Sequence, residues 1–164
     1  MHILLDTNVL SELLRAQPEA AVTTWFAAQQ PDGLYVSAVT QAEMMLGAGL
    51  LPTGKRKQAL DQALRTMFEE DFARRILPFD SGAVAAYVEI VRKRRAAGRP
   101  IAQFDAQIAA ISVSRGFDLA TRNVSDFEAC GVTVVNPWGS EMPHVTITED
   151  QFRRAMIFVQ ATIP

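Results

Sequence analysis

The sequence has one cysteine, two histidines and no long apolar run. Cys130 alone cannot form an internal disulfide, which excludes a disulfide-stapled secreted scaffold and favours a reducing cytoplasm. With only His2 and His144 beside that thiol, a zinc site of cysteine and histidine ligands is not expected. Because no stretch of about 18 apolar residues occurs and no signal-peptide pattern opens the chain, we expect no membrane partner.

An excess of either charge is also lacking, since 16 Lys and Arg residues stand against 18 Asp and Glu residues and give a formal net charge of −2. This balance excludes a protein that binds nucleic acid through bulk positive charge, but not a nuclease whose acidic site holds cations. The 164 residues, 49% of them hydrophobic, suit one compact domain whose core needs no disulfide or metal.

What the sequence does contain is an alternation of short apolar segments with helical patterns. Strands are predicted at residues 3–5, 34–36, 76–77, 119–121 and 132–135, and helices at 7–15, 18–29, 40–50, 55–72, 80–97 and 102–115. The alternation predicts an α/β domain over residues 1–138, with three α/β/α layers around a central parallel sheet. Residues 139–164 look different and are interpreted as an appended tail, either a fused segment or an extension that docks on a groove.

Three acids stand out from their surroundings. Asp6 directly follows the first strand, with Thr7 and Asn8 beside it, where ligands bind in open α/β sheets; capping of the next helix explains it equally well. Glu43 lies in a nearly uncharged helical segment, although its spacing from residue 40 is also that of a capping box. Asp105 interrupts an apolar helical stripe and is costly to bury unpaired, although the helix dipole would favour an acid in a first turn.

A second strand end carries Thr121 and Asn123, with Asp126 nearby, although an ordinary turn explains these residues by themselves. Because strand ends and helix starts can meet at one edge of a sheet, we expect these side chains to converge with the three acids. Clustered carboxylates repel one another unless a cation neutralises them, and oxygen ligands favour Mg²⁺ or Mn²⁺. Such ions activate water and polarise phosphodiesters, so the pattern predicts metal-assisted phosphodiester hydrolysis.

Five cations crowd the end of one predicted helix, and a second basic cluster lies at residues 55–57. The five are Arg92, Lys93, Arg94, Arg95 and Arg99. Either cluster could contact the phosphates of a nucleic acid. A solvated helix end, where cations are favoured by the helix dipole, explains the five equally well.

Five motifs together resemble a known family, and they read MHILLDTNVLSELLR, VSAVTQAEMMLG, IAQFDAQIAA, LATRNVSDF and VVNPW. Over residues 1–138 the chain resembles a PIN-domain protein, and more narrowly the VapC/FitB-type toxins of bacterial toxin–antitoxin pairs. The resemblance implies a PIN-like fold and an endoribonuclease that depends on Mg²⁺ or Mn²⁺. The residues that match the family's catalytic and metal-binding positions are Asp6, Glu43, Asp105 and Asn123, the last standing where relatives have Asp or Asn. The supporting residues that it implies are Thr7, Asn8, Thr121 and Asp126.

The resemblance also implies partners. These are an RNA substrate, with transfer RNA as one candidate, a cognate antitoxin whose C-terminal peptide lies along an apolar groove, and a second copy of the chain in a homodimer. Two alternatives remain open. A catalytically weak PIN-like module that binds RNA or protein agrees with the neutral Asn123, whereas a phosphatase acting through Asp6 lacks the second Asp and the later lysine that it would need.

Overall fold

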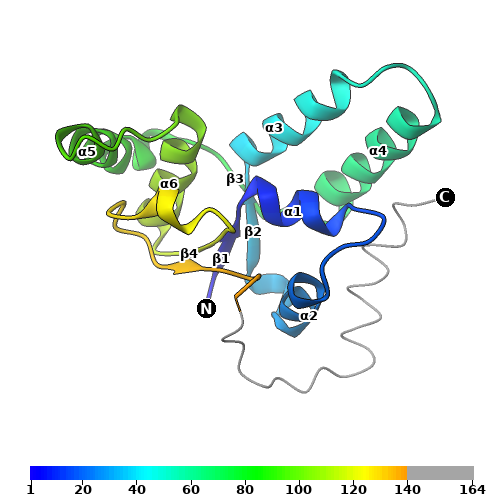
Figure 1. Ribbon diagram of the computed structural model, residues 1–164, viewed down its shortest axis with the longest axis horizontal. Helices are drawn as coiled ribbons and strands as arrows, with labels where there is room; N and C mark the ends of the chain where they lie inside the picture. The colour runs from blue at the N-terminus through cyan, green and yellow to red at the C-terminus, as the bar shows by residue number, and fades with distance from the viewer. Residues whose placement is uncertain (140–164) are drawn as a thin grey trace.

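The computed structural model describes residues 1–139, and its centre is a sheet of five parallel strands in the order β3-β2-β1-β4-β5 (Figure 1). The strands are β1 (Ile3–Leu5), β2 (Leu34–Ser37), β3 (Ile76–Leu77), β4 (Asp118–Ala120) and β5 (Val134–Val135). The central strand β1 pairs with β2 and β4, and this register aligns Leu5 with Val36 and Ala120. All five strands therefore end at the same edge, and the prediction of a central parallel sheet is confirmed.

Within residues 1–139, six α-helices cover the two faces of this sheet. Four lie on one side of it and two on the other, which confirms the three predicted α/β/α layers (Figure 1). The four are α1 (Thr7–Leu13), α2 (Ala20–Ala28), α3 (Ala38–Gly49) and α4 (Lys55–Thr66), and the two are α5 (Ser81–Ala96) and α6 (Gln103–Arg115). None of these helices is long and apolar enough to cross a membrane.

Burial of both sheet faces explains why the strands are continuous apolar runs. Successive strand residues point to opposite faces, so Ile3 and Leu5 pack with helices α1–α4, and Leu4 packs with α5 and α6. Leu4 and Leu5 are each 0% exposed. An alternating polar pattern would leave a polar side chain inside one of the two cores, and this is why the sequence pattern identified a parallel sheet.

Several element ends differ from the sequence prediction. Helix α3 begins at Ala38, two residues before the predicted start, because the Ser37 hydroxyl caps it by accepting the Thr40 amide at 2.9 Å. The long helix predicted at 55–72 divides into α4 and a π-helical turn (Met67–Asp71), in which two apolar side chains turn inward. Other elements are shorter than predicted, namely α1, α2 and β5.

The predicted tail at 139–164 falls outside the described residues, apart from Gly139. Its division from the domain at 1–138 therefore stays a prediction.

Substitutions of a buried and an exposed apolar residue should have different effects on the free energy of unfolding. Leu10 of α1 is 0% exposed, so we expect Leu10→Ala to lower the free energy of unfolding by ~2–5 kcal/mol in urea denaturation followed by circular dichroism. Val88, on α5, is 56% exposed, so Val88→Ala should change the free energy of unfolding by less than about 0.5 kcal/mol. Equal losses in the two variants would contradict this assignment of the core.

Candidate active site

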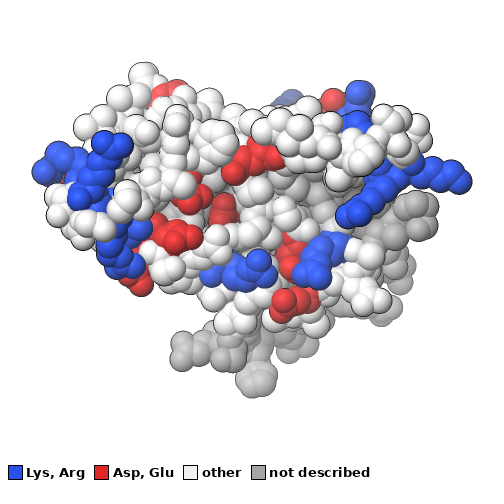
Figure 2. Space-filling model, turned by 45° about the horizontal axis from the view of Figure 1, so that its top comes forward, with Lys and Arg blue, Asp and Glu red and all other residues white. Residues whose placement is uncertain are grey.

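A cavity of about 580 Å³ lies where the strands end, and it is called the acidic pocket here. Its lining brings together four predicted residues from distant segments, namely Asp6, Glu43, Asp105 and Asn123. They follow or lie just beyond β1, β2 and β4 and at the start of α6, the position where open α/β sheets bind ligands. Figure 2 shows acidic side chains gathered across the middle of one face of the molecule, with basic ones mostly toward its ends.

Asp6 is buried at the end of β1, and three donors hold its carboxylate. Oδ1 accepts the Thr7 amide at 2.7 Å, and Oδ2 accepts the Asn8 side-chain amide at 2.7 Å and the Thr121 hydroxyl at 2.6 Å. Burial raises the pKa of Asp6, and the hydrogen bonds from Thr121, Thr7 and Asn8 oppose that rise. Asp6 stands at the N-cap of α1 and lines the acidic pocket as well, so both explanations drawn from the sequence describe it.

The segment after β4 is tied to the same carboxylate. Thr121 is fully buried, and its hydroxyl also accepts the Asn8 side-chain amide at 2.9 Å and the Asn123 backbone amide at 3.1 Å. Asn8 in turn accepts the Arg122 backbone amide at 3.2 Å. Residues 121–123 are therefore more than an ordinary turn, because their hydrogen bonds fix the positions of two adjacent strand ends.

Glu43 reaches the pocket from α3, and its carboxylate accepts the Thr7 hydroxyl at 2.6 Å. Because α3 starts at Ala38 with Ser37 as its cap, Thr40 lies inside the helix. The capping-box explanation of Glu43 is therefore wrong, and its side chain is instead part of the pocket wall.

Asp105 lies half-buried in the first turn of α6. Burial is the main cause that raises the pKa of Asp105 to about 6, and nearby negative charges add to it. Those charges belong to Asp6, Asp126 and Glu43. Asp126 itself lies in a short 3₁₀-helix (Val124–Phe127) and is not among the lining residues, so it acts on the pocket through its charge.

The donor set of the acidic pocket suits a hard divalent cation, because it offers carboxylate and amide oxygens and no sulfur. Within residues 1–139, no three His, Cys, Asp or Glu side chains are arranged as a ready-made metal cage. Mg²⁺ is commonly held by one or two carboxylates together with waters and substrate phosphates, so the residues present fit such an ion. Burial and the nearby negative charges together raise the Asp105 pKa, and a bound cation would offset both.

Four residues that line the acidic pocket were not predicted from the sequence, namely Ser11, Glu12, Arg15 and Arg122. Ser11 and Arg15 follow Thr7 at intervals of four on or just beyond α1, so helical spacing would have placed them on the same face. Arg122 lies between two residues that were predicted. The signal was present in the spacing, but these residue types are common on protein surfaces.

A larger groove of about 900 Å³ adjoins the acidic pocket and is lined by residues of α1, α3 and α4; it is called the apolar groove here. The two cavities share Thr7, Ser11, Arg15 and Glu43. The other lining residues include Leu14, Met44, Gly47, Ala48, Leu60 and Leu64, together with Lys55 and Arg56. A ligand in the apolar groove would thus have direct access to Glu43.

The basic cluster predicted at the end of α5 lines neither cavity. Its cations are largely balanced by acids, since Arg92 and Lys93 pair with Glu89 and Arg99 pairs with Glu128. Arg95 is exposed. The prediction of a phosphate contact does not hold for Arg94, because it is 6% exposed and its Nη1 donates to the Glu128 carbonyl at 3.0 Å.

Comparisons with known proteins agree with this architecture. Residues 3–129 match the PIN domain family. The VapC ribonuclease Y4jK of Sinorhizobium fredii is 42% identical over 83% of this chain and 97% of that protein, and the toxin FitB of Neisseria gonorrhoeae is 43% identical over 83% and 98%. A solved structure of FitAB bound to an IR36 DNA fragment superposes with a TM-score of 0.81 at 42% identity, covering 87% of this chain and 99% of that one.

Asp105 should make the stability of the metal-free protein depend on pH. Its folded pKa of about 6 exceeds the ordinary value of 3.8, so between these values the folded state binds more protons than the unfolded state. In EDTA, we therefore expect the free energy of unfolding to fall as the pH rises from about 4 to about 6, measured by urea denaturation. Asp105→Asn, which cannot ionise, should flatten this slope, and an unchanged slope would refute the assignment.

Proposed function

Because this chain belongs to the PIN-domain family, we propose that it is a Mg²⁺- or Mn²⁺-dependent endoribonuclease and the toxin of a toxin–antitoxin pair. The observation that carries this proposal is the convergence of Asp6, Glu43 and Asp105, from three separate segments, on one pocket at the end of a parallel sheet. The relatives named VapC ribonuclease and toxin FitB support the activity and the biological role.

Asp6 and Asp105 would hold the ion through their carboxylates, and Asn123 would add a neutral oxygen at the rim. When bound, the ion supplies positive charge to the scissile phosphate and lowers the pKa of the attacking water. Asn123 is neutral, and Glu12, the fourth acid of the lining, is engaged by Arg15 and by the Glu19 amide, so one ion is better supported than two.

Glu43 would receive and orient the attacking water. The Thr7 hydroxyl fixes one Glu43 oxygen at 2.6 Å, which leaves the other oxygen to accept a hydrogen bond from that water. Asn8 and Thr121 keep the Asp6 carboxylate in place, so that the acids do not depend on the ion for their positions. Attack by water on the phosphodiester then needs no covalent intermediate on the protein.

Neutral substitutions of the acids should remove RNA cleavage without unfolding the domain. Asp6→Asn or Asp105→Asn should lower the rate about 100-fold or more, since each loses charge that stabilises the ion and the transition state by several kcal/mol. Cleavage of labelled transfer RNA in Mg²⁺ measures this loss. Glu69→Gln removes an exposed acid far along the chain from these residues and serves as the matched control.

Full activity in either aspartate variant would refute the catalytic assignment. The alternative, a catalytically weak module that binds RNA or protein, is separated by titrating the wild-type protein with Mn²⁺ in a calorimeter. A nuclease site should bind Mn²⁺ and lose that binding in Asp6→Asn, whereas a catalytically weak module should bind the ion hardly at all.

The proposed antitoxin partner would dock in the apolar groove. The groove combines apolar walls with one acid, Glu43, which it shares with the acidic pocket, so it suits an apolar peptide with a cation that reaches this acid. The exposed apolar side chains of Met45, Leu46 and Leu50 on and beside α3 support the further proposal of a homodimer. Since the proposed substrate is cellular RNA, we place the activity in the cytoplasm.

Two glycines of α3 allow a direct test of groove docking. Gly47 lines the groove and an added Cβ there would meet nothing within 4 Å, so Gly47→Gln should fill the groove without disturbing the helix. We expect at least about a tenfold loss of affinity, from lost apolar contact, for the proposed cognate antitoxin, measured by calorimetry. Gly49→Gln, equally free of clashes but outside the groove lining, should bind that protein normally. Equal affinity in both variants would refute docking there.

A further inference from the structure

The acidic pocket presents a problem for the proposed ribonuclease, because RNA is a polyanion and the pocket walls are carboxylates. Two cations nevertheless line this pocket, and they are Arg15 and Arg122. Neither belongs to the basic clusters singled out in the sequence. Because they line the pocket, these two arginines are candidates to bind the negatively charged substrate.

Neighbouring residues position Arg122, but none of them forms an ion pair with its guanidinium group. Its backbone amide donates to Asn8 at 3.2 Å, and its guanidinium carbon lies 5.2 Å from the centre of the Trp138 ring. Contact with the face of an aromatic ring leaves the N–H groups at the guanidinium edge available. No acid of residues 1–139 forms an ion pair with Arg122, so its N–H groups can meet an anion at the pocket.

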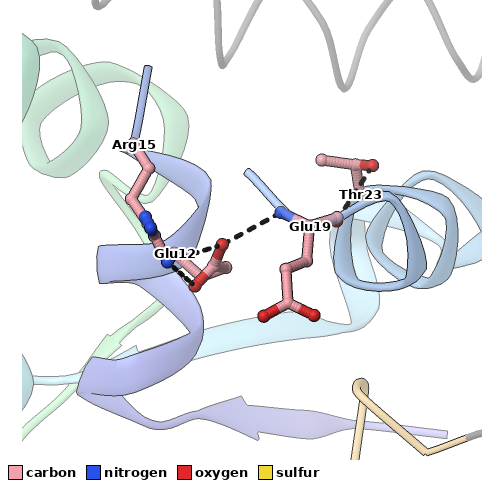
Figure 3. A network of polar contacts seen from close by, with 4 residues as sticks. All are labelled: Glu12, Arg15, Glu19 and Thr23. Carbon is pink, nitrogen blue, oxygen red and sulfur yellow. Dashed lines mark hydrogen bonds and ion pairs between the residues drawn. The ribbon is translucent and has the colours of Figure 1, made fainter. Parts of the chain in front are cut away.

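Arg15 is positioned by a buried acid. Glu12 is 4% exposed, and its carboxylate accepts Arg15 Nη1 at 3.2 Å and the Glu19 backbone amide at 2.9 Å (Figure 3). The second of these bonds fixes Glu12 between the end of α1 and the start of α2. The Arg15 side chain is itself 59% exposed, and only Nη1 is engaged by Glu12, so the other N–H groups remain free to bind.

The α5 cluster offers no comparable site. Its cations lie outside both cavities, and most of them are paired with acids or buried. Arg15 also pairs with an acid, Glu12, but Arg15 and Arg122 differ from the α5 cations because they line the pocket that holds Asp6, Glu43 and Asp105. Pre-positioned guanidinium groups lose less entropy when they bind phosphate than mobile surface lysines do.

We propose that Arg15 and Arg122 form a phosphate clamp that draws an RNA strand across the acidic pocket, binding phosphates that flank the scissile bond. The clamp rests on the proposed ribonuclease function and adds the residues that bind the substrate. Glu12 and Trp138 act as positioning residues, because they hold the two guanidinium groups and do not touch the strand.

The test compares charge removal on the pocket with charge removal elsewhere. Binding of a fluorescently labelled single-stranded RNA is measured at several salt concentrations, with the full chain in an Asp6→Asn background that prevents cleavage. Arg15→Gln and Arg122→Gln should each weaken binding about tenfold, since each loses a charge-assisted hydrogen bond. Each should also reduce the slope of log K against log salt by about 0.7, the value for one phosphate contact on a single strand.

Two matched controls remove the same charge from the α5 cluster. Arg95→Gln and Arg99→Gln should change binding less than about twofold and leave the salt slope unchanged. Arg122→Lys keeps the positive charge but lacks the planar guanidinium group. It should show the wild-type salt slope and only part of the wild-type affinity for RNA. A substitution that only disturbed the local structure would not reduce the salt slope by the value of one phosphate contact. The slope therefore distinguishes a binding role of the arginine from a structural one.

Normal affinity and slope in both arginine variants, while the protein with Asp6 intact cleaves RNA, would overturn the clamp and leave the ribonuclease proposal standing. Losses equal to those of the α5 controls would also overturn it, since the effect would then be one of general charge. Weaker binding of the proposed cognate antitoxin with unchanged RNA binding would assign the arginines to that partner instead. If the protein with Asp6 intact cleaves no RNA, the ribonuclease proposal fails, and the binding data still decide the clamp.

Discussion

The parallel pairing of β1 between β2 and β4 is the constraint on which the site depends. The register aligns Leu5 with Val36 and Ala120, so the residues that come next are Asp6, Ser37 and Thr121, side by side at one sheet edge. Neighbouring strands lie about 4.8 Å apart, which lets a hydroxyl on one strand end reach a carboxylate on the next. The 2.6 Å bond from Thr121 to Asp6 follows from that spacing, and Ser37 starts the helix that carries Glu43.

The acids at this edge are costly to keep ionised, mainly because they are buried and also because they lie near one another. Burial and mutual charge raise the pKa of both Asp6 and Asp105, which means that the folded chain holds these groups at a free-energy cost while they are ionised. Hydrogen bonds to Asp6 offset part of this cost within the fold. The remainder would favour binding of a cation in the proposed site, so the feature that lowers the stability of the domain is also the one that supports the metal proposal.

The surroundings of the pocket suggest how substrate and inhibitor would compete. The acidic pocket and the apolar groove share four lining residues, so a peptide in the groove and a strand on the pocket would meet at Arg15 and Glu43. Glu12, which also lines the acidic pocket, joins α1 to the start of α2 through its buried carboxylate. Control of the proposed nuclease by a partner therefore needs no change of fold, only occupation of adjoining surface.

The sequence by itself determined the architecture and the three acids. Apolar strands buried on both faces and amphipathic helices between them have local signatures, and Asp105 stands out because an unpaired acid on an apolar helix is costly to bury. Element ends were less predictable, since the choice between Ser37 and Thr40 as a cap depends on where β2 stops. Only the tertiary structure decided which cations line the pocket. Arg94 turns inward and Arg92 meets Glu89, whereas Arg15 and Arg122 open onto the pocket. The physical reason is that a charge acts through its three-dimensional neighbours, and a run of arginines in the chain does not reveal which of them a nearby acid neutralises.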